Sequence, residues 1–116
     1  MLWSDPILEN DVAADSDFAP NEPRDCSFMF GLRPLKNILR KERLLTLIRA
    51  HEVQQEGYQM YLWEGENNFP LAITIFSAPN YCGSYENRGA VAFSKGGDEK
   101  LQIKQFDPST DLVKPY

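Results

Sequence analysis

Few side chains of this sequence could carry chemistry, and His51 is the first of them. It is the only histidine of the chain and lies close behind the short apolar run Leu44–Ile48. An imidazole can ligate a metal or transfer a proton, although a single histidine more often has a structural role. A metal site needs three or four ligands, and neither a second histidine nor a cysteine-rich cluster accompanies this one. If His51 binds a metal, most of the ligands must come from elsewhere.

Arg24 is the second candidate, because it stands alone among the carboxylates of the first 25 residues. A planar guanidinium can hold a phosphate or a carboxylate through two parallel hydrogen bonds. The alternative is a solvated ion pair that contributes little to stability. Composition alone favours the ion pair.

The stretch Leu71–Asn87 supplies the remaining candidates. Residues Ile73–Phe76 are apolar or β-branched, which predicts a strand buried on both faces. Ser77–Gly83 follows at once, with turn formers that carry Tyr81 and Cys82. A loop at the end of a buried strand is a common place for functional side chains. The alternative is a hairpin with an incidental tyrosine, and no sequence neighbour of Cys82 would activate its thiol.

Length and charge restrict the function classes. The chain has 116 residues, enough for one small domain, and a formal net charge of -5. This acidic balance argues against a nucleic acid or an anionic membrane as the main partner. Cys26 and Cys82 lie far apart, so neither a disulfide framework nor a zinc knuckle is expected. Free thiols, without a signal peptide or a membrane span, predict a cytoplasmic protein, with the nucleus as the second compartment.

The first half of the chain must position these residues on few elements. Residues 7–25 are acidic and broken by prolines, which predicts a long loop. The spacing of Leu35, Ile38 and Leu39 predicts an amphipathic helix over Arg33–Glu42, with its basic residues on the solvated face. The apolar run Leu44–Ile48 predicts a strand buried on both sides.

The second half is expected to be mostly β-sheet. Residues 58–63 partly alternate between apolar and polar types, and residues 65–68 supply a turn before the buried strand. Ala90–Phe93 and Leu101–Phe106 alternate more regularly and are joined by Gly96–Asp98, which predicts a hairpin.

Three segments in order along the chain resemble motifs of one known family. They are L-W-S-D-P at Leu2–Pro6, R-A-H-E at Arg49–Glu52 and S-A-P-N-Y-C at Ser77–Cys82. Together they resemble the phosphoprotein phosphatases, which are metal-dependent serine/threonine phosphatases, and look closest to the calcineurin branch. The resemblance implies an α/β fold with mixed α and β elements: the C-terminal part of a metallo-dependent phosphatase (calcineurin-like phosphoesterase) β-sandwich flanked by helices.

The resemblance also implies a two-metal hydrolase of phosphoserine and phosphothreonine, with manganese, or iron and zinc, as the ions. In that family a hydroxide held between the two ions attacks phosphorus in line. His51 matches a histidine that ligates one metal, and Arg24 matches an arginine that grips the substrate phosphate. Asp5, in the W-S-D-P motif, matches a supporting residue.

The loop residues are assigned in the same way. Tyr81 matches a tyrosine that overhangs the site, Asn80 precedes it in the motif, and Cys82 matches a position that reacts with toxins in some relatives. One departure is Asp25, where the family normally has glycine. The implied partners are phosphoprotein substrates and, for a calcineurin type, calmodulin and a calcium-binding regulatory subunit, with no nucleic acid and no membrane span.

The second departure is one of extent. Residues 1–116 resemble only the C-terminal portion of one catalytic domain, because the G-D-x-H-G, G-D-x-x-D-R-G and G-N-H-E motifs of the N-terminal metal-binding half are absent. The chain alone is therefore expected to be inactive. A competing hypothesis is a truncated, non-catalytic module that binds extended peptides at the edge strand 101–106, through Gln102, Ile103 and Lys104. A degenerate gene product is the third alternative.

Overall fold

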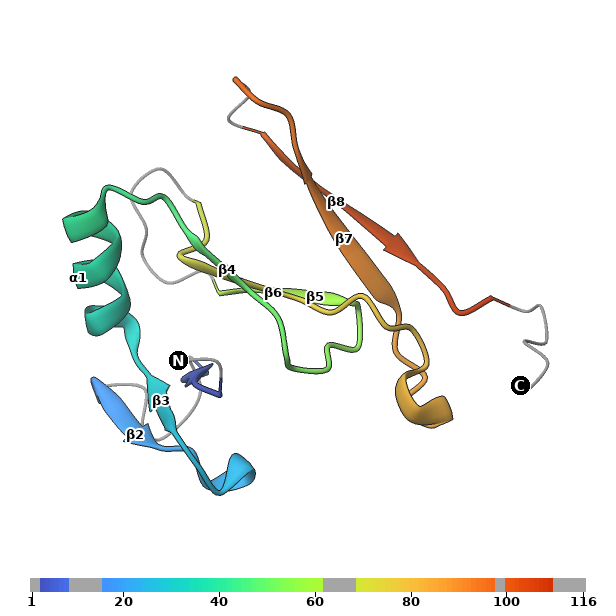
Figure 1. Cartoon of the computed structure of the whole chain (residues 1–116), viewed down its shortest axis with the longest axis horizontal. Helices are drawn as coiled ribbons and strands as arrows, with labels where there is room; N and C mark the ends of the chain where they lie inside the picture. Colours follow the sequence, from blue (N-terminus) through green and yellow to red (C-terminus); the bar gives the residue numbers. More distant parts are fainter. Residues whose placement is uncertain (1–2, 9–15, 62–68, 98–99, 110–116) are drawn as a thin grey trace. The chain divides into compact units, whose positions relative to one another are not determined.

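The computed structural model describes residues 3–8, 16–61, 69–97 and 100–109 (Figure 1). Its internal contacts divide the chain into two compact units. The first comprises Met1–His51 and Met60–Ile73, and the second comprises Glu52–Gln59 and Thr74–Tyr116. None of the helices in these described ranges has the length and hydropathy that a bilayer crossing requires.

The first unit contains a small sheet in the order β1-β3-β2. Strand β1 (Asp5–Pro6) pairs in parallel with β3 (Phe28–Phe30), and β2 (Phe18–Pro20) pairs with β3 in the antiparallel sense. Between β2 and β3 lies a short 3₁₀ turn, η1 (Glu22–Arg24). The prediction of one long loop over residues 7–25 was therefore wrong for β2 and η1, because pairing with β3 orders a proline-rich segment. Residues 9–15 lie outside the described ranges.

Helix α1 (Leu32–Glu42) confirms the predicted amphipathic helix. Leu35 and Leu39 are buried and pack in a core cluster with Tyr61, Leu71 and Ala72. Ile38, which the spacing placed on the same face, is instead exposed. The buried stripe of the helix is thus narrower than its apolar pattern, and its solvated side carries the basic residues, as expected.

The end of α1 explains why the prediction for Leu44–Ile48 was wrong. Arg43 adopts a left-handed conformation, its N–H donates to the carbonyl of Arg40, and the N–H of Leu44 donates to that of Leu39. This pair of bonds is a Schellman termination, so the start of the apolar run closes the helix. Strand β4 (Leu47–Arg49) begins only afterwards, and Leu44, Leu45 and Ile48 are 57%, 53% and 48% exposed.

A second sheet has the order β4-β6-β5. Strand β5 spans Tyr58–Tyr61. The end of the predicted alternation, residues 62–63, and the predicted turn at residues 65–68 lie outside the described ranges. Strand β6 spans Ala72–Ile75, with Ala72, Ile73 and Thr74 fully buried. This confirms the prediction of a strand buried on both faces at this point of the chain.

The second unit contains the predicted hairpin. Strands β7 (Gly89–Ser94) and β8 (Leu101–Phe106) pair in the antiparallel sense, with Ala92 opposite Ile103. Before the hairpin, the chain leaves β6 and forms the 3₁₀ turn η3 (Tyr81–Gly83). This turn lies within the loop that the sequence predicted between the buried strand and the hairpin.

Candidate functional site

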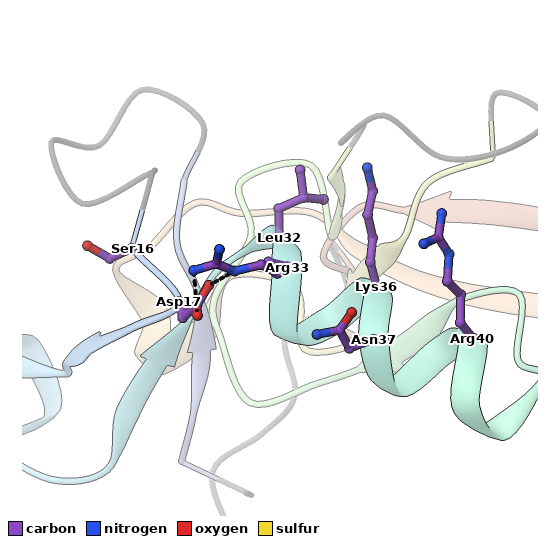
Figure 2. A pocket seen from close by; sticks show the side chains of 7 residues that line it. All are labelled: Ser16, Asp17, Leu32, Arg33, Lys36, Asn37 and Arg40. Carbon is purple, nitrogen blue, oxygen red and sulfur yellow. Dashed lines mark hydrogen bonds and ion pairs between the residues drawn. The ribbon is translucent and has the colours of Figure 1, made fainter.

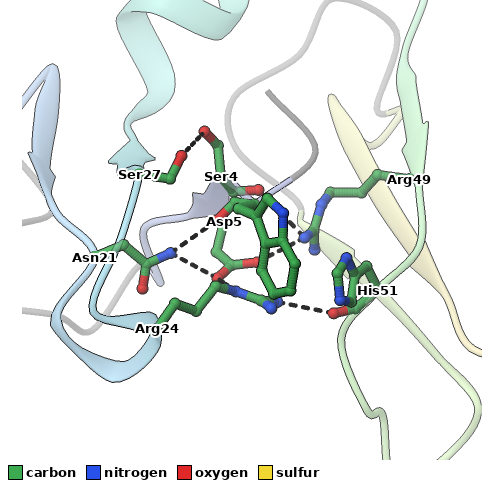
Figure 3. Close-up of polar contacts among 8 residues, drawn as sticks. Ser4, Asp5, Asn21, Arg24, Ser27, Arg49 and His51 are labelled. Atoms are coloured by element: carbon green, nitrogen blue, oxygen red, sulfur yellow. Dashed lines mark hydrogen bonds and ion pairs between the residues drawn. The ribbon is translucent and has the colours of Figure 1, made fainter.

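The carboxylate of Asp5 gathers two arginines and an amide in the first unit (Figure 3). Arg49 donates from Nη2 to Oδ1 over 2.6 Å, and Arg24 donates from Nη2 to the same oxygen over 2.9 Å. Arg24 also donates from Nε to Oδ2, which Asn21 reaches over 2.8 Å. The side chains of Asp5 and Arg49 are each 10% exposed. Asp5 is thus the centre of a largely buried ionic cluster.

The surroundings of Asp5 set its ionisation. Burial raises the pKa of this carboxyl, but the hydrogen bonds from Arg24 and Asn21, with the positive charges of Arg24 and Arg49, outweigh it. The net pKa lies below the usual value of 3.8. Asp5 is therefore an anion at neutral pH that orients both arginines.

His51 is joined to this cluster through its backbone. Arg24 donates from Nη2 to the carbonyl oxygen of His51 over 2.8 Å. His51 has a φ of 76°, which an L residue rarely adopts, and its exposed ring lies 4.4 Å from the Trp3 ring, measured between centroids. The Arg24 guanidinium lies 5.6 Å from the centroid of the same indole. The fold therefore brings Asp5, Arg24 and His51 together. The roles that the resemblance assigns to them stay predictions.

The described residues do not form a metal site by themselves. Within the described ranges, no group of three or more His, Cys, Asp or Glu side chains could hold an ion. One imidazole is too small a donor set, because protein sites for such ions use at least three ligands. The sequence expectation that ligands beyond His51 come from elsewhere stays a prediction.

Arg24, to which the resemblance assigns phosphate binding, is held by neighbouring residues and is followed by Asp25. Its fork already contacts Asp5 and the carbonyl of His51, which fixes its position. Asp25 follows directly, with a φ of 52° and its N–H donating to the carbonyl of Glu22. Asp25 thus places a carboxylate in a left-handed position that favours glycine.

The predicted loop residues lie in the second unit. Tyr81 is 43% exposed, and its ring contacts Phe76 edge to face and lies near Tyr85. Cys82 has a free, exposed thiol, and both Asn80 and Cys82 have positive φ, at 47° and 55°. The loop therefore presents Tyr81 and Cys82 outward from an unusual backbone conformation.

Sequence reasoning missed Asn87, which is fully buried beneath this loop. Its Oδ1 accepts from the N–H of Tyr81, and its Nδ2 donates to the carbonyls of Ala78 and Arg88, each over 2.9 Å. A lone asparagine among turn formers gives no signal of this role. The partners are backbone groups, which no sequence pattern identifies.

The residues of the predicted docking strand lie in β8. Gln102 and Lys104 are exposed and Ile103 is half-buried. The Lys104 ammonium lies 5.1 Å from the centroid of the Phe93 ring on β7. In the described part of the chain, β8 pairs with β7 alone.

A hollow of about 370 Å³ lies beside α1 in the first unit (Figure 2). It is lined by Ser16, Asp17, Leu32, Arg33, Lys36, Asn37 and Arg40. Arg33 donates from Nε and Nη2 to the two carboxylate oxygens of Asp17, over 2.6 and 2.7 Å. Both side chains are exposed, so the hollow agrees with the interpretation of a solvated helix face. No residue that the resemblance assigns to the phosphatase site lines it.

Comparison with known proteins identifies the family of the chain. No family model matches the chain. The catalytic subunit A1 of serine/threonine-protein phosphatase 2B from Saccharomyces cerevisiae is 40% identical over 117 residues, which cover 94% of this chain and 21% of that protein. The chain belongs to the phosphoprotein phosphatase family. The resemblance found in the sequence is thereby confirmed.

Further relatives agree with the membership in the phosphoprotein phosphatases. The A2 catalytic subunit of phosphatase 2B from the same yeast is 35% identical over 132 residues, covering 92% of the chain and 22% of that subunit. A solved serine/threonine phosphatase from Saccharomyces cerevisiae, described as similar to human phosphatase PP5, superimposes with a TM-score of 0.67 at 27% identity. That match covers 92% of this chain and 32% of the other, and confirms the α/β phosphatase fold class.

This member of the phosphoprotein phosphatases corresponds to a C-terminal portion of the catalytic subunits that it matches. It spans about a fifth of the length of the two yeast relatives.

Proposed function

We propose that this chain supplies the C-terminal part of a serine/threonine phosphatase that removes phosphate from phosphoserine and phosphothreonine. The observation that carries the proposal is the Asp5 cluster. It joins residues of the W-S-D-P, arginine and R-A-H-E segments through direct hydrogen bonds, and the bonded pair Asp5 and Arg49 is 44 positions apart in sequence. Such convergence is typical of a site in which one anion orients cationic side chains for an anionic substrate.

The proposed roles follow from these contacts. Asp5 fixes Arg24 and Arg49, and Arg24 holds the backbone of His51. We assign Arg24 to the substrate phosphate and His51 to one of two metal ions, manganese or a pair of iron and zinc. The other ligands are assigned to the part of the phosphatase that this chain does not span.

The setting of this activity is part of the same proposal. Phosphoproteins are the proposed substrates, in the cytoplasm or nucleus. The similarity to the phosphatase 2B subunits further suggests a calcium-binding regulatory subunit and calmodulin as partners. The 116-residue chain by itself is proposed to be inactive.

A segment exchange tests this function. The matching segment of the yeast phosphatase 2B subunit A1 is replaced by this chain, and hydrolysis of a phosphoserine peptide is measured. The hybrid is expected to be active, and Arg24→Ala and His51→Ala should each lower kcat/KM by about 100-fold or more, as for removal of a preorganised charge. Metal content should fall with His51→Ala alone. Asp17→Asn is the matched control, because Asp17 forms an exposed ion pair with Arg33 of α1. An inactive but folded and metal-loaded hybrid would refute the proposal.

Strand β8 favours a second function, the capture of an extended peptide. The N–H of Ala90 donates to the carbonyl of Phe76, and the Ala90 carbonyl accepts from Ser77, so both groups face away from β8. Opposed residues of antiparallel strands share their hydrogen-bonding state, which alternates along the strands. Ala92 and its partner Ile103 therefore also face outward. No described strand pairs with this outer edge of β8, so the backbone of Ile103 is available there for strand addition.

Proline substitution tests this edge with a built-in control. Ile103→Pro removes an outward N–H and should abolish binding of an extended peptide while the hairpin persists. Lys104→Pro removes an N–H that points to β7 and should disrupt the hairpin itself. Peptide affinity is measured by calorimetry and the hairpin by amide exchange. Unchanged affinity in Ile103→Pro would exclude strand addition.

A further inference from the structure

We propose that Asn87 is the positioning residue of the loop Ala78–Arg88, and that it sets where Tyr81 and Cys82 stand. The consequence for catalysis rests on the proposed phosphatase function. The structural part stands on the contacts of this chain alone.

The Asn87 side chain uses both ends of its amide. Its Oδ1 accepts from the N–H of Tyr81 in the middle of the loop, and its Nδ2 donates to the carbonyls of Ala78 and Arg88 at the two ends. Its own carbonyl accepts from the N–H of Asn80 over 2.8 Å. One buried residue therefore connects the centre of the loop, at Tyr81, to its two ends, at Ala78 and Arg88.

The loop needs such a fastening because of its backbone. Asn80, Cys82 and Glu86 have φ values of 47°, 55° and 51°, in the left-handed region that favours glycine. Residues persist in such conformations only where the surrounding contacts determine them. The local bonds are short-range ones, such as that from the N–H of Gly83 to the carbonyl of Asn80. The Asn87 side chain adds the bonds that connect this local turn to the two ends of the loop, Ala78 and Arg88.

The far side of the loop has a separate support. Gln55 donates from Nε2 to the carbonyl of Glu86 over 3.1 Å, and its own carbonyl accepts from the N–H of Arg88 over 2.9 Å. These bonds do not involve the Asn87 side chain. Removing the amide should therefore release the Tyr81 half of the loop and leave the Arg88 end attached.

The chemistry of the site requires an amide. Replacement by leucine keeps nearly the same volume but provides neither the acceptor for Tyr81 nor the donors for the two carbonyls. Replacement by alanine removes the volume as well. Comparison of the two variants separates hydrogen bonding from packing.

Amide hydrogen exchange on the full chain tests the proposal directly. In Asn87→Leu and Asn87→Ala, the Tyr81 N–H should exchange at least tenfold faster than in the unsubstituted chain. The N–H of Ala90, which donates to the Phe76 carbonyl, should keep its rate and serves as the internal reference. Ser84→Ala, an exposed position in the same loop, is the matched control and should change neither rate.

A second readout follows the loop through its thiol. In a Cys26→Ser background, the alkylation rate of Cys82 by iodoacetamide should change severalfold in both Asn87 variants and remain constant in Ser84→Ala. The proposal is overturned if Asn87→Leu leaves the Tyr81 exchange rate unchanged, since packing would then suffice. It is also overturned if the Ala90 amide loses its protection together with Tyr81 in both variants, since Asn87 would then support the whole fold.

The hybrid phosphatase separates this inference from the proposed function. With Asn87→Leu, the KM for a phosphopeptide should rise several-fold, while kcat for a small phosphate ester should change little. If the hybrid with the unsubstituted segment is inactive, the phosphatase proposal fails and the amide exchange result still decides the role of Asn87. If the hybrid is active and the KM for the phosphopeptide is unchanged, the catalytic consequence is refuted.

Discussion

Nη2 of Arg49 lies 2.6 Å from Oδ1 of Asp5, although 44 positions separate them in the sequence. The contact joins the residues after Trp3 to the end of β4, which leads directly to His51. Because Arg24 binds the same carboxylate, one buried anion determines the positions of two cations. The stability of the first unit and the geometry of the candidate site therefore depend on the same residue.

Asp5→Asn should strongly destabilise the protein. The substitution removes the negative charge that Arg24 and Arg49 both contact, and loss of one partner of a largely buried ion pair costs about 3 kcal/mol. Urea unfolding followed by circular dichroism measures this as a lower midpoint. Asp17→Asn is the control, because its ion pair with Arg33 is exposed to solvent and should matter little. Equal midpoints for both variants would contradict the central role of Asp5.

The same carboxylate predicts a dependence of stability on pH. The pKa of Asp5 is lowered in the folded protein, so its contribution is fully present above its unfolded pKa, near 3.8. It is lost as the pH falls below that value and through the lower folded pKa. The free energy of unfolding of the unsubstituted chain should therefore fall on acidification in this range. Asp5→Asn should show a smaller fall, and identical slopes would exclude Asp5 as the group responsible.

Asp25→Gly should stabilise the protein slightly. Asp25 has a φ of 52°, where glycine avoids steric strain, and its replacement is expected to raise the free energy of unfolding by up to about 1 kcal/mol. Thermal unfolding measures the change. Asp25→Asn separates charge from conformation, because asparagine also tolerates this region and should alter stability less. A lower melting temperature for the glycine variant would show that the Asp25 side chain makes a net favourable contribution.

Local patterns predicted the elements that depend on local physics. The spacing of Leu35 and Leu39 indicated α1, and the β-branched run at Ile73 indicated a buried strand, because period and burial are readable in sequence. Leu44 was misinterpreted, since its apolar side chain belongs to the helix termination that Arg43 begins. Apolar character alone does not distinguish a buried strand from such a termination.

The candidate site was predicted by resemblance rather than by spacing. Nothing in the sequence separation of Asp5 and Arg49 indicates that they meet, because the two residues lie on strands of different sheets, β1 and β4, and contact each other only through their side chains. Asn87 shows the same limit more clearly, since all the partners of its side chain are backbone groups. Such contacts depend on where the chain passes and leave no trace in residue types.

Thr46→Val should stabilise the first unit. Oγ1 of Thr46 is buried and has no hydrogen-bond partner among the described residues. Valine has nearly the same shape and removes a buried polar group, whose burial without a partner costs about 1–3 kcal/mol. The midpoint of urea unfolding should rise. Thr74→Val is the matched control. Thr74 is also buried but, unlike Thr46, it has an interaction partner, so its replacement should destabilise the protein. A destabilised Thr46→Val variant would indicate that its hydroxyl is satisfied in solution.

Among the turn glycines of the second unit, Gly57 should be the one whose replacement by alanine destabilises the protein most. Gly57 has a φ of 80°, and an added Cβ would lie 2.5 Å from the backbone carbon of Gly89 and 2.7 Å from the nitrogen of Ala90. Steric overlap with backbone adds to the conformational strain, so a loss of about 3 kcal/mol is expected.

Gly97→Ala measures the cost of the positive φ alone, without steric overlap. Gly97 has a φ of 83°, but no described residue beyond its chain neighbours lies within 4 Å of its added Cβ, so only about 1 kcal/mol should be lost. Unfolding of both variants is measured by urea titration, with amide exchange in β7 as the local probe. The close approach of Gly57 to Gly89 requires the larger loss in Gly57→Ala. Equal losses in the two variants would mean that these two backbone segments separate freely in solution.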